Sequence, residues 1–520
     1  MATLVLGPLL RHVGERDAVV WVETDAPCEV EVLGARARTF HVHGHHYALV
    51  VVEGLEPGTV TEYEVALDGE RVWPAAGAPP SRIHTLHRER PVTVVFGSCR
   101  AAAPHDAEWD GKHGVDALRA YALRLQDEPA ERLPHALVLL GDQVYVDEAA
   151  PETRAFARGR RDTSRPPYEE TADFEEYAML YRESWSEPVV RWLLSTVSVA
   201  SIFDDHELAD DWNISESWVH DVRRQTWWRE RVVGAFSSYW LYQHLGNLSP
   251  QSLAEDARYA AVRESDDGFA ELRELALGQL ETDTGTRWSY ARDLGHSRLV
   301  VIDSRAGRVL DHGRRDMLDE EEWRFVEAEA RRDTQHLLIA TSIPYLLGRG
   351  IHDFQGWNER VCAGAWGRLA ARLGEKVRRA VDLDHWASFQ DSFRRLARLL
   401  AGLEPPGRVL LLSGDVHYAY VAETTLPRVK QVVVSPLRNL LAPRERRAQR
   451  FALSPAGRAL GWALARAAGA PRPPFEWRIA QGPWFDTTVG TLELDGTRAR
   501  LRFECARPGP RLETVLETEL

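Results

Sequence analysis

Residues 409–417 of the chain read VLLLSGDVH and join a short, uninterrupted apolar run to a carboxylate and an imidazole. Such a run, bounded by a glycine, is typical of a strand that is buried on both faces of its sheet. Short apolar runs of this kind recur between long amphipathic stretches at six further places: 92–96, 136–140, 197–203, 299–302, 337–340 and 432–434. Strands of this kind that alternate with helices predict an α/β domain.

Nearly every one of these runs ends in polar residues. The run 92–96 is followed by GSCR, 136–140 by GDQVY, 197–203 by DDHE, 299–302 by DSR and 337–340 by TS. In α/β sheets, ligands gather beyond the carboxyl ends of the strands. The repeated layout therefore predicts one convergent site built from several strand ends.

Composition and charge limit the classes of protein that fit. The chain has 520 residues, of which 44% are hydrophobic, and its 64 Lys and Arg against 78 Asp and Glu leave a net charge of −14. This composition is that of a globular protein with one to three domains. The negative charge disfavours a nucleic-acid partner. No apolar run approaches the roughly 18 residues that span a bilayer, so no membrane partner is expected.

The cysteines and the opening residues bear on the compartment. Cys28, Cys99, Cys362 and Cys505 lie far apart and form no CxxC pair, which favours free thiols in a reducing environment. Residues 1–14 carry no basic head before their apolar stretch. These features lead us to expect a cytoplasmic location.

The pattern of apolar and polar residues changes near residue 85. Residues 18–67 show short period-two stretches separated by turns, which predict strands. The phrase LEPGT at 55–59, followed by YEV, resembles a fibronectin type III β-sandwich, so we expect such a domain over residues 1–85 and a linker at 75–81. The catalytic domain is predicted over 90–520, with helical insertions at about 151–195 and 215–285.

Two features of the C-terminal part are also predicted. An Asp-Gly turn at 495–496, flanked by alternating residues, indicates a β-hairpin. The segment 438–450 carries five arginines, which fit either a solvated helix face or an anion-attracting patch near the site.

The strand-end motifs together supply the ligands of a metal site. A single Asp or His after a strand is more often a cap, but several in one domain make metal binding the better interpretation. The candidates are Cys99, Asp142, Tyr145, Asp205, His206, Asp415 and His417.

Four of these motifs, in their order along the chain, resemble the alkaline phosphatase D family of the metallophosphoesterase superfamily. They are FGSC at 96–99, GDxxY at 141–145, DDHE at 204–207 with DDW at 210–212, and SGDVH at 413–417. The resemblance covers about residues 90–505. It implies a two-sheet metallophosphatase sandwich flanked by helices, related to purple acid phosphatases, which often carry a fibronectin-like N-terminal domain.

The resemblance also implies the metals. A first ion, Fe³⁺, would be held by Cys99, Asp142, Tyr145 and His417, and Asp142 would bridge to a second ion held also by Asp205 and Asp415. Thiolate, phenolate and imidazole suit a transition ion, whereas an all-carboxylate set suits Ca²⁺, Mn²⁺ or Mg²⁺. Either Asp204 or Asp205 fits the second site, and the alignment with related motifs favours Asp205.

Two further residues receive roles from the resemblance. His206 corresponds to the histidine that contacts phosphate or protonates the leaving oxygen, and the alternative is a structural histidine bonded to Glu207 or a nearby loop. Arg305 lies in a motif that resembles the family's Asp-x-Arg. It would bind the substrate phosphate, or equally form an internal salt bridge.

The function that follows is metal-dependent hydrolysis of a phosphate ester, in which a hydroxide bridging the two ions attacks phosphorus. The alternatives are a regulatory protein that keeps the metal site with little turnover, and a metal-dependent oxidoreductase. The sequence departs from secreted members of the family at Asp210 and Asp211, where those members often have asparagines, and in lacking an export signal. A role in periplasmic phosphate scavenging is therefore not predicted.

Overall fold

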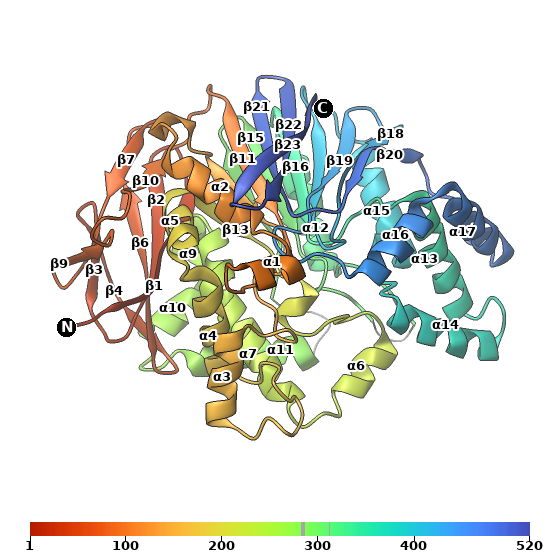
Figure 1. The fold of residues 1–520 in the computed structure, drawn as a ribbon, viewed down its shortest axis with the longest axis horizontal. Helices are drawn as coiled ribbons and strands as arrows, with labels where there is room; N and C mark the ends of the chain where they lie inside the picture. The colour runs from red at the N-terminus through yellow and green to blue at the C-terminus, as the bar shows by residue number, and fades with distance from the viewer. Residues whose placement is uncertain (282–285, 311–312) are drawn as a thin grey trace.

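The computed structural model describes residues 1–281, 286–310 and 313–520. The N-terminal part is all β and lies at one end of the molecule (Figure 1). Its strands form sheets of order β1-β2-β6-β5 and β4-β3-β8-β9 and a pair β10-β7. Their bounds are Leu4–Val13, Asp17–Thr24, Glu29–Val32, Ala35–Arg38, Phe40–Val42, His45–Glu53, Val60–Tyr63, Val65–Leu67, Glu70–Trp73 and Ser81–His84, for β1 to β10 in order.

Alternation along these strands divides the N-terminal side chains between two cores. Val20 and Val50 pack with Val30 and Val65 inside the β-rich part. Trp21, one position along β2 from Val20, instead joins a core shared with the helices that follow. Period-two alternation puts successive side chains on opposite faces, so the β1-β2-β6-β5 sheet is covered on both sides.

Polar contacts tie this same sheet to the helices. The buried Arg11 guanidinium donates to the backbone oxygen of Gln243 at 2.6 Å, and the hydroxyls of Tyr47 and Tyr242 lie 3.1 Å apart. The N-terminal strands and the helices are therefore packed as neighbours without an intervening solvent layer.

Two larger sheets form the centre of the molecule. A six-stranded sheet has the order β13-β12-β11-β21-β22-β23, and a seven-stranded sheet has the order β14-β15-β16-β17-β19-β18-β20. The strands are β11 Val92–Gly97, β12 Ala136–Leu139, β13 Ser198–Ser201, β14 Tyr290–Leu294, β15 Ser297–Ile302, β16 His336–Thr341, β17 Val409–Ser413, β18 Ala419–Thr424, β19 Val429–Val433, β20 Trp477–Trp484, β21 Thr488–Asp495, β22 Arg498–Arg507 and β23 Arg511–Glu519.

The apolar runs of the sequence are the central strands of these sheets. Val94 and Phe96 point into the core between the two sheets, whereas Val95 packs against helices on the outside. In the seven-stranded sheet, Val301 likewise points into the core between the two sheets, and Val300 packs against helices on the outside. A strand buried on both faces reads as continuously apolar, which is why these runs lack alternation. The predicted α/β sandwich flanked by helices is confirmed.

Helices cover the outer faces of both sheets (Figure 1). Residues 107–126 form α1 and α2, residues 151–196 form α3, α4 and α5, and the stretch from 216 onward forms α6 to α11 with a π-helical segment, Trp240–His244. The last residues of the insertion predicted at about 215–285, residues 282–285, lie outside the described residues. The bounds are α1 Ala107–His113, α2 Ala117–Gln126, α3 Pro151–Arg160, α4 Phe174–Trp185, α5 Pro188–Thr196, α6 Glu216–Val222, α7 Trp228–Tyr239, α8 Leu245–Asn247, α9 Pro250–Glu255, α10 Ala257–Glu264 and α11 Phe269–Glu281.

The seven-stranded sheet has its own helical layer. Its helices are α12 Glu320–Ala330, α13 Arg349–Cys362, α14 Arg368–Ala380, α15 Gln390–Ala401, α16 Pro443–Leu453 and α17 Pro455–Ala467. The predicted hairpin is β21 and β22, paired as far as Asp495 and Arg498 around a two-residue loop. Of the five arginines at 438–450, Arg438 is buried and the other four lie on α16.

Within the part of the chain that the structure describes, no helix combines the length and the apolar character needed to span a bilayer.

Candidate metal centre

The predicted site residues meet where parallel strands of the two sheets end. Cys99 follows β11, Asp142 and Tyr145 follow β12, the motif 204–207 follows β13, and the motif 413–417 follows β17. β11, β12 and β13 run parallel in one sheet, as do β15, β16 and β17 in the other. The sandwich therefore brings the carboxyl ends of both sets of strands to one place.

The loops of the two sheets touch directly at Gly414. A Cβ added there would lie 2.0 Å from the hydroxyl oxygen of Ser98 in the β11 loop. The backbone amide of Asp415 donates to that same hydroxyl at 3.1 Å. Glycine is the residue that permits this approach, so the GD pair at 414–415 joins the two halves of the site.

Four candidate ligands have left-handed backbone conformation. The φ angles are 58° at Cys99, 50° at Asp142, 63° at Asp415 and 55° at His417. This conformation costs roughly 1–2 kcal/mol for a residue with a side chain. Strain of this kind collects at functional sites, where the surrounding structure holds it in place.

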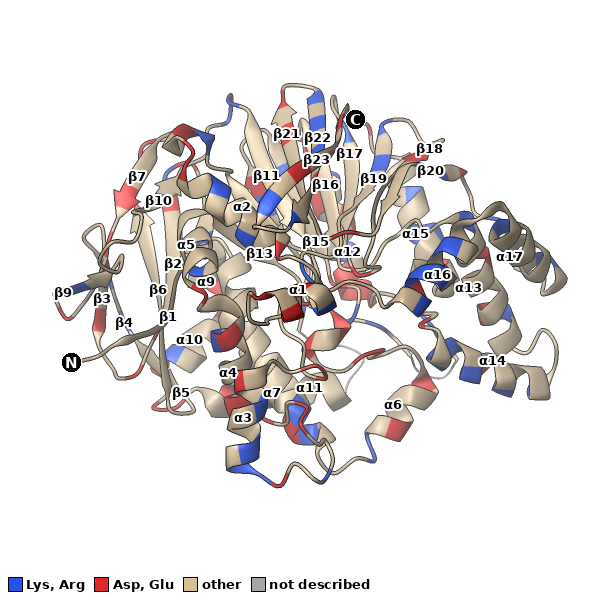
Figure 2. Ribbon diagram, in the orientation of Figure 1, with Lys and Arg blue, Asp and Glu red and all other residues tan. Residues whose placement is uncertain are grey.

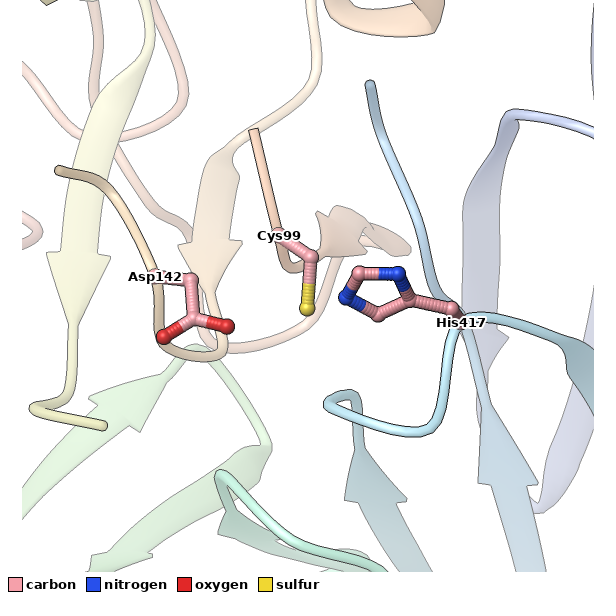
Figure 3. Close-up of side chains that lie close together, drawn as sticks. All are labelled: Cys99, Asp142 and His417. Carbon is pink, nitrogen blue, oxygen red and sulfur yellow. The ribbon is translucent and has the colours of Figure 1, made fainter. Parts of the chain in front are cut away.

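One cluster of ligand atoms is formed by Cys99, Asp142 and His417 (Figure 3). Their sulfur, carboxylate and imidazole atoms all lie within 4.8 Å of one another. Tyr145 lies beside them, and its hydroxyl is 3.5 Å from Oδ2 of Asp142. Burial lowers the pKa of His417 to about 4, so its ring is neutral and able to act as a ligand at neutral pH.

The Cys99 sulfur is held by short polar contacts. Ser435 donates its hydroxyl to Sγ at 3.2 Å, and the Ser98 hydroxyl lies 3.0 Å from the same atom. Burial, followed by the charges of Asp142 and Asp415, raises the pKa of the Cys99 thiol well above its ordinary value. A bound cation would reverse this shift, because metal coordination deprotonates a thiol.

A second cluster adjoins the first and consists of Asp204, Asp205 and Asp415. Asp142, Asp205 and His206 form a further group within the same 4.8 Å limit, so Asp142 of the sulfur-containing cluster lies close to Asp205 of the second cluster. Both Asp204 and Asp205 are buried beside Asp415. Both aspartates belong to the second cluster, so each of them is a candidate ligand of the second ion.

The donor set fits cations. Oδ1 of Asp142 and Oδ2 of Asp204 are buried and have no hydrogen-bond partner among the described residues. Burial and the neighbouring carboxylate charges raise the pKa of both side chains well above the ordinary value. Buried carboxylates without partners are costly unless they are paired or coordinate a metal. A sulfur, an imidazole and an oxygen-rich group provide that coordination.

His206 is oriented by Asp147, which sequence reasoning missed. The ring atom Nδ1 of His206 lies 2.9 and 2.8 Å from the two carboxylate oxygens of Asp147. Burial opposes ionisation of the ring, but the charges of Asp147 and Asp142 raise the pKa of His206 well above its ordinary value. The alternative partner that we considered, Glu207, makes other contacts. A second acid in the run 141–147, two residues after Tyr145, was the available signal.

Glu207 joins the loops after β12 and β13. Its carboxylate accepts hydrogen bonds from the backbone amides of Asp142 at 3.2 Å, Gln143 at 2.9 Å and Asp204 at 2.8 Å. Burial raises its pKa to about 7. This residue therefore fixes the backbone on which two of the candidate ligands stand.

Arg305 forms internal ion pairs. Its Nε donates to Asp204 at 2.6 Å, its Nη2 lies 3.3 Å from Asp205 and 3.2 Å from Asp415, and its Nη1 pairs with Asp384. The guanidinium is buried. Two roles were predicted for Arg305, phosphate binding and an internal salt bridge. Its contacts in the structure are those of an internal salt bridge.

The pair Asp384 and His385 was also missed. Nε2 of His385 lies 3.0 Å from Oδ2 of Asp415, and the ring stands beside Asp384. Burial opposes ionisation, but Asp384 and Asp415 raise the pKa of His385 to about 10. The motif DLDH at 382–385 is visible in the sequence, but no strand precedes it, so nothing linked it to the site.

The fold is that of the metallophosphatases PhoD and purple acid phosphatase. The family described as PhoD-like phosphatase matches residues 117–282, and a domain of unknown function (DUF7800) matches residues 1–85. The first match includes Asp142, Tyr145, Asp205 and His206. Cys99, Arg305, Asp415 and His417 lie outside it. No curated protein sequence matches the chain.

Solved structures share the fold. A structure of PhoD superposes with a TM-score of 0.60 at 12% identity, covering 99% of this chain and 90% of that chain. The purple acid phosphatase PPD1 from yellow lupin (Lupinus luteus) seeds gives a TM-score of 0.50 at 12% identity, covering 98% and 73%. At this identity the likenesses concern the fold alone.

Sequence match and fold agree. The resemblance to the alkaline phosphatase D family that the motifs predicted is confirmed, and with it the assignment to the phosphoric ester hydrolases.

Proposed function

We propose that the protein hydrolyses a phosphate ester at the candidate metal centre, with water as the nucleophile and no phosphorylated side chain. The observation that carries the proposal is that Asp142 lies in the cluster with Cys99 and His417 and also groups with Asp205, a member of the second cluster, and with His206. Two adjoining cation sites with a proton-bearing histidine at their edge are the arrangement that phosphoester hydrolysis requires.

The proposed ligands follow the chemistry of the donors. Cys99, Asp142, Tyr145 and His417 would hold Fe³⁺, and Asp142, Asp205 and Asp415 would hold Ca²⁺ or another divalent ion such as Mn²⁺ or Mg²⁺. Bound metal ions supply Lewis-acid polarisation of the phosphoryl oxygens and lower the pKa of water.

His206 is proposed to donate a proton to the departing alcohol oxygen. Its Nδ1 is engaged by Asp147, which leaves Nε2 to carry the mobile proton. The Asp147 carboxylate favours the protonated ring, which is the form that a general acid requires. Asp147 acts through His206 and is a positioning residue.

Arg305 is proposed to organise the second site, although phosphate binding was also predicted for it. Its contacts with Asp204, Asp205 and Asp415 offset the repulsion among these carboxylates. His385 supports Asp415 from the other side.

The test combines elemental analysis of the purified protein with a panel of phosphate monoesters and diesters. We expect two metal ions per chain, one of them iron, and turnover of at least one class of ester. Metal-loaded protein that hydrolyses neither class would overturn the proposal.

Visible absorption tests the iron site separately. Thiolate and phenolate bound to ferric iron absorb visible light, so Cys99→Ser and Tyr145→Phe should each change the spectrum. An unchanged spectrum in Cys99→Ser, with iron still bound, would remove Cys99 from the ligand set.

A further inference from the structure

Two helices at one end of the molecule bury small or polar residues and expose large apolar ones. The residues of α14 that are buried are Gly374 and Arg378, whereas Leu369 is 82% exposed and Leu373 is 64% exposed. A helix on a soluble protein normally turns its apolar stripe toward the core. In α14 this orientation is inverted.

α17 shows the same inversion. Its buried residues are Gly457 and Gly461. A Cβ on Gly461 would lie 2.4 Å from the backbone oxygen of Gly350 in α13, so the two helices are in backbone contact at this point. Leu460 and Trp462, which flank this contact, are 50% and 57% exposed.

Exposed apolar residues are concentrated here. Among the described residues, ten large hydrophobic residues are exposed, and seven of them lie between 366 and 462: Trp366, Leu369, Leu373, Val381, Phe451, Leu460 and Trp462. α13 packs against α14, α16 and α17, so these segments form one end of the molecule. Figure 1 shows them grouped at the right of the view.

The same end is strongly basic. Residues 366–381 and 443–472, hereafter the basic end, contain twelve Lys and Arg and two Glu in a chain whose net charge is −14. Figure 2 shows blue segments on α14 and α16. Ten of the cations form no ion pair or side-chain hydrogen bond within the described residues, and two of these, Arg446 and Arg450, stack on Phe485. In the part of the chain that the structure describes, the other eight also lack an aromatic contact: Arg368, Arg372, Lys376, Arg444, Arg447, Arg458, Arg466 and Arg472.

Cations and apolar residues alternate along one face of α14. Arg368, Arg372 and Lys376 are spaced four residues apart and are exposed, and Leu369 and Leu373 follow the first two directly. Residues four apart share a helix face. Long cationic side chains beside exposed leucines can reach phosphate groups while the leucines enter an apolar layer.

A cavity of about 630 Å³ adds a place for a single anionic group. Arg458, Arg466 and Arg472 line it together with Trp462. Two acids also line the cavity, Asp353 and Glu476, and both are paired with Arg349, which stacks on Trp477. The three other arginines are unpaired and able to bind an anion.

From these observations we propose that the basic end binds the surface of an anionic lipid bilayer, with α14 and α17 lying along the interface. A second copy of the chain would set like charges against each other. Nucleic acid would match the charge but would leave the aliphatic side chains Leu369, Leu373 and Leu460 without a partner. Anionic lipid satisfies both, since phosphate lies directly above an apolar layer. This binding is peripheral and requires no membrane-spanning helix, so it departs from the expectation of no membrane partner, which rested on the lack of a long apolar run.

The test is co-sedimentation of the full chain with vesicles. Vesicles of equal parts phosphatidylglycerol and phosphatidylcholine should bind the protein at low salt, and vesicles of phosphatidylcholine alone should not. High salt should weaken the binding, because exposed charges are screened. Because each cation near an anionic surface strengthens the binding about fivefold, Arg368→Gln/Arg372→Gln/Lys376→Gln should lower the partition coefficient on the order of a hundredfold.

Matched variants separate this surface from exposure in general. Leu369→Ser/Leu373→Ser should also weaken vesicle binding, whereas Leu33→Ser/Tyr168→Ser, which changes exposed apolar residues elsewhere, should not. Arg38→Gln/Arg88→Gln/Arg229→Gln is the control for loss of three charges. All four variants should retain the turnover of a soluble phosphate ester.

Three outcomes would overturn the proposal. They are absence of binding to anionic vesicles at low salt, equal loss of binding in the control variants, and tight binding to duplex DNA without binding to vesicles.

Discussion

The candidate metal centre and the basic end treat charge in opposite ways. At the metal centre, carboxylates are buried and Arg305 contacts four of them: Asp204, Asp205, Asp384 and Asp415. At the basic end, eight exposed cations have no ion pair, side-chain hydrogen bond or aromatic contact among the described residues, and exposed leucines lie next to them. One region holds excess negative charge in a dry interior, and the other holds excess positive charge in water.

The difference indicates what each region lacks. Burial of an ionised carboxylate has a large desolvation cost, so a group of buried carboxylates is stable only when cations are bound close to it. Exposed cations stay hydrated and have almost no desolvation cost. They attract an anionic partner over about a Debye length. The first region is therefore suited to bound metal ions and the second to reversible, salt-sensitive binding of an extended anionic surface.

The largest expected effect is the loss of activity in Asp142→Asn. Because Asp142 is in the sulfur-containing cluster and also groups with Asp205 of the second cluster, we expect turnover to fall by at least about a thousandfold, equivalent to about 4 kcal/mol. Steady-state kinetics and metal analysis measure this. Asp116→Asn, which changes a buried aspartate paired with Arg100 outside the clusters, is the control and should keep its metals. Activity within tenfold of the parent in Asp142→Asn with both ions bound would contradict the bridging role.

Metal removal should make the stability of the protein fall with rising pH. The pKa values of Asp142 and Asp204 are raised in the folded chain, so above about pH 4 the unfolded chain ionises these groups more easily than the folded one. Their contribution to the free energy of unfolding therefore decreases as pH rises from about 4 toward their folded pKa values. Thermal melts of chelated protein across this range measure it, with Asp142→Asn showing a weaker decline. Equal slopes in parent and variant would refute the assignment.

Asp147→Asn should move the alkaline limb of the pH–rate profile to lower pH. The Asp147 carboxylate raises the pKa of His206, so its removal lets the ring lose its proton sooner. The effect should be greatest for esters with poor leaving groups, whose departure needs the proton most. Asp210→Asn is the matched control, because its carboxylate lies 3.8 Å from His206 Nε2 and should shift the limb less. An unchanged limb in Asp147→Asn would exclude His206 as the acid.

At the basic end, the packing of α17 should depend on Gly461. Gly461→Val would place a side chain against the backbone of α13, which has no room for it. Overpacking of this kind typically costs 1–3 kcal/mol. We expect a lower melting temperature, increased proteolysis within 443–472 and normal turnover. A melting temperature equal to that of the parent would contradict the close packing.

The smallest effect is expected for Leu369→Ser/Leu373→Ser. Both side chains are mostly exposed, so the free energy of unfolding should change by no more than about 0.5 kcal/mol. Urea denaturation measures this. A loss above about 2 kcal/mol would mean that these leucines stabilise the fold, and it would remove the reason to assign them to a partner.

Much of the fold and part of the site were predictable from the sequence. The runs at 92–96 and 409–412 are strands because both of their faces are buried, and the motifs that follow them converge as parallel strands require. The partners of those motifs were not predictable in the same way. Asp147 lies two residues beyond the motif at 141–145, and its contact with His206 joins two loops that are 59 positions apart.

What the sequence by itself determined is the α/β class, the strand positions and the inventory of chemically active residues, because local periodicity and strand-end motifs reside in consecutive residues. Only the tertiary structure decided that Arg305 pairs with carboxylates, that His385 supports Asp415, and that α14 and α17 turn their leucines outward. These depend on which distant segments become neighbours. An amphipathic helix has the same pattern whether its apolar face meets the core or the solvent, and only its packing distinguishes the two.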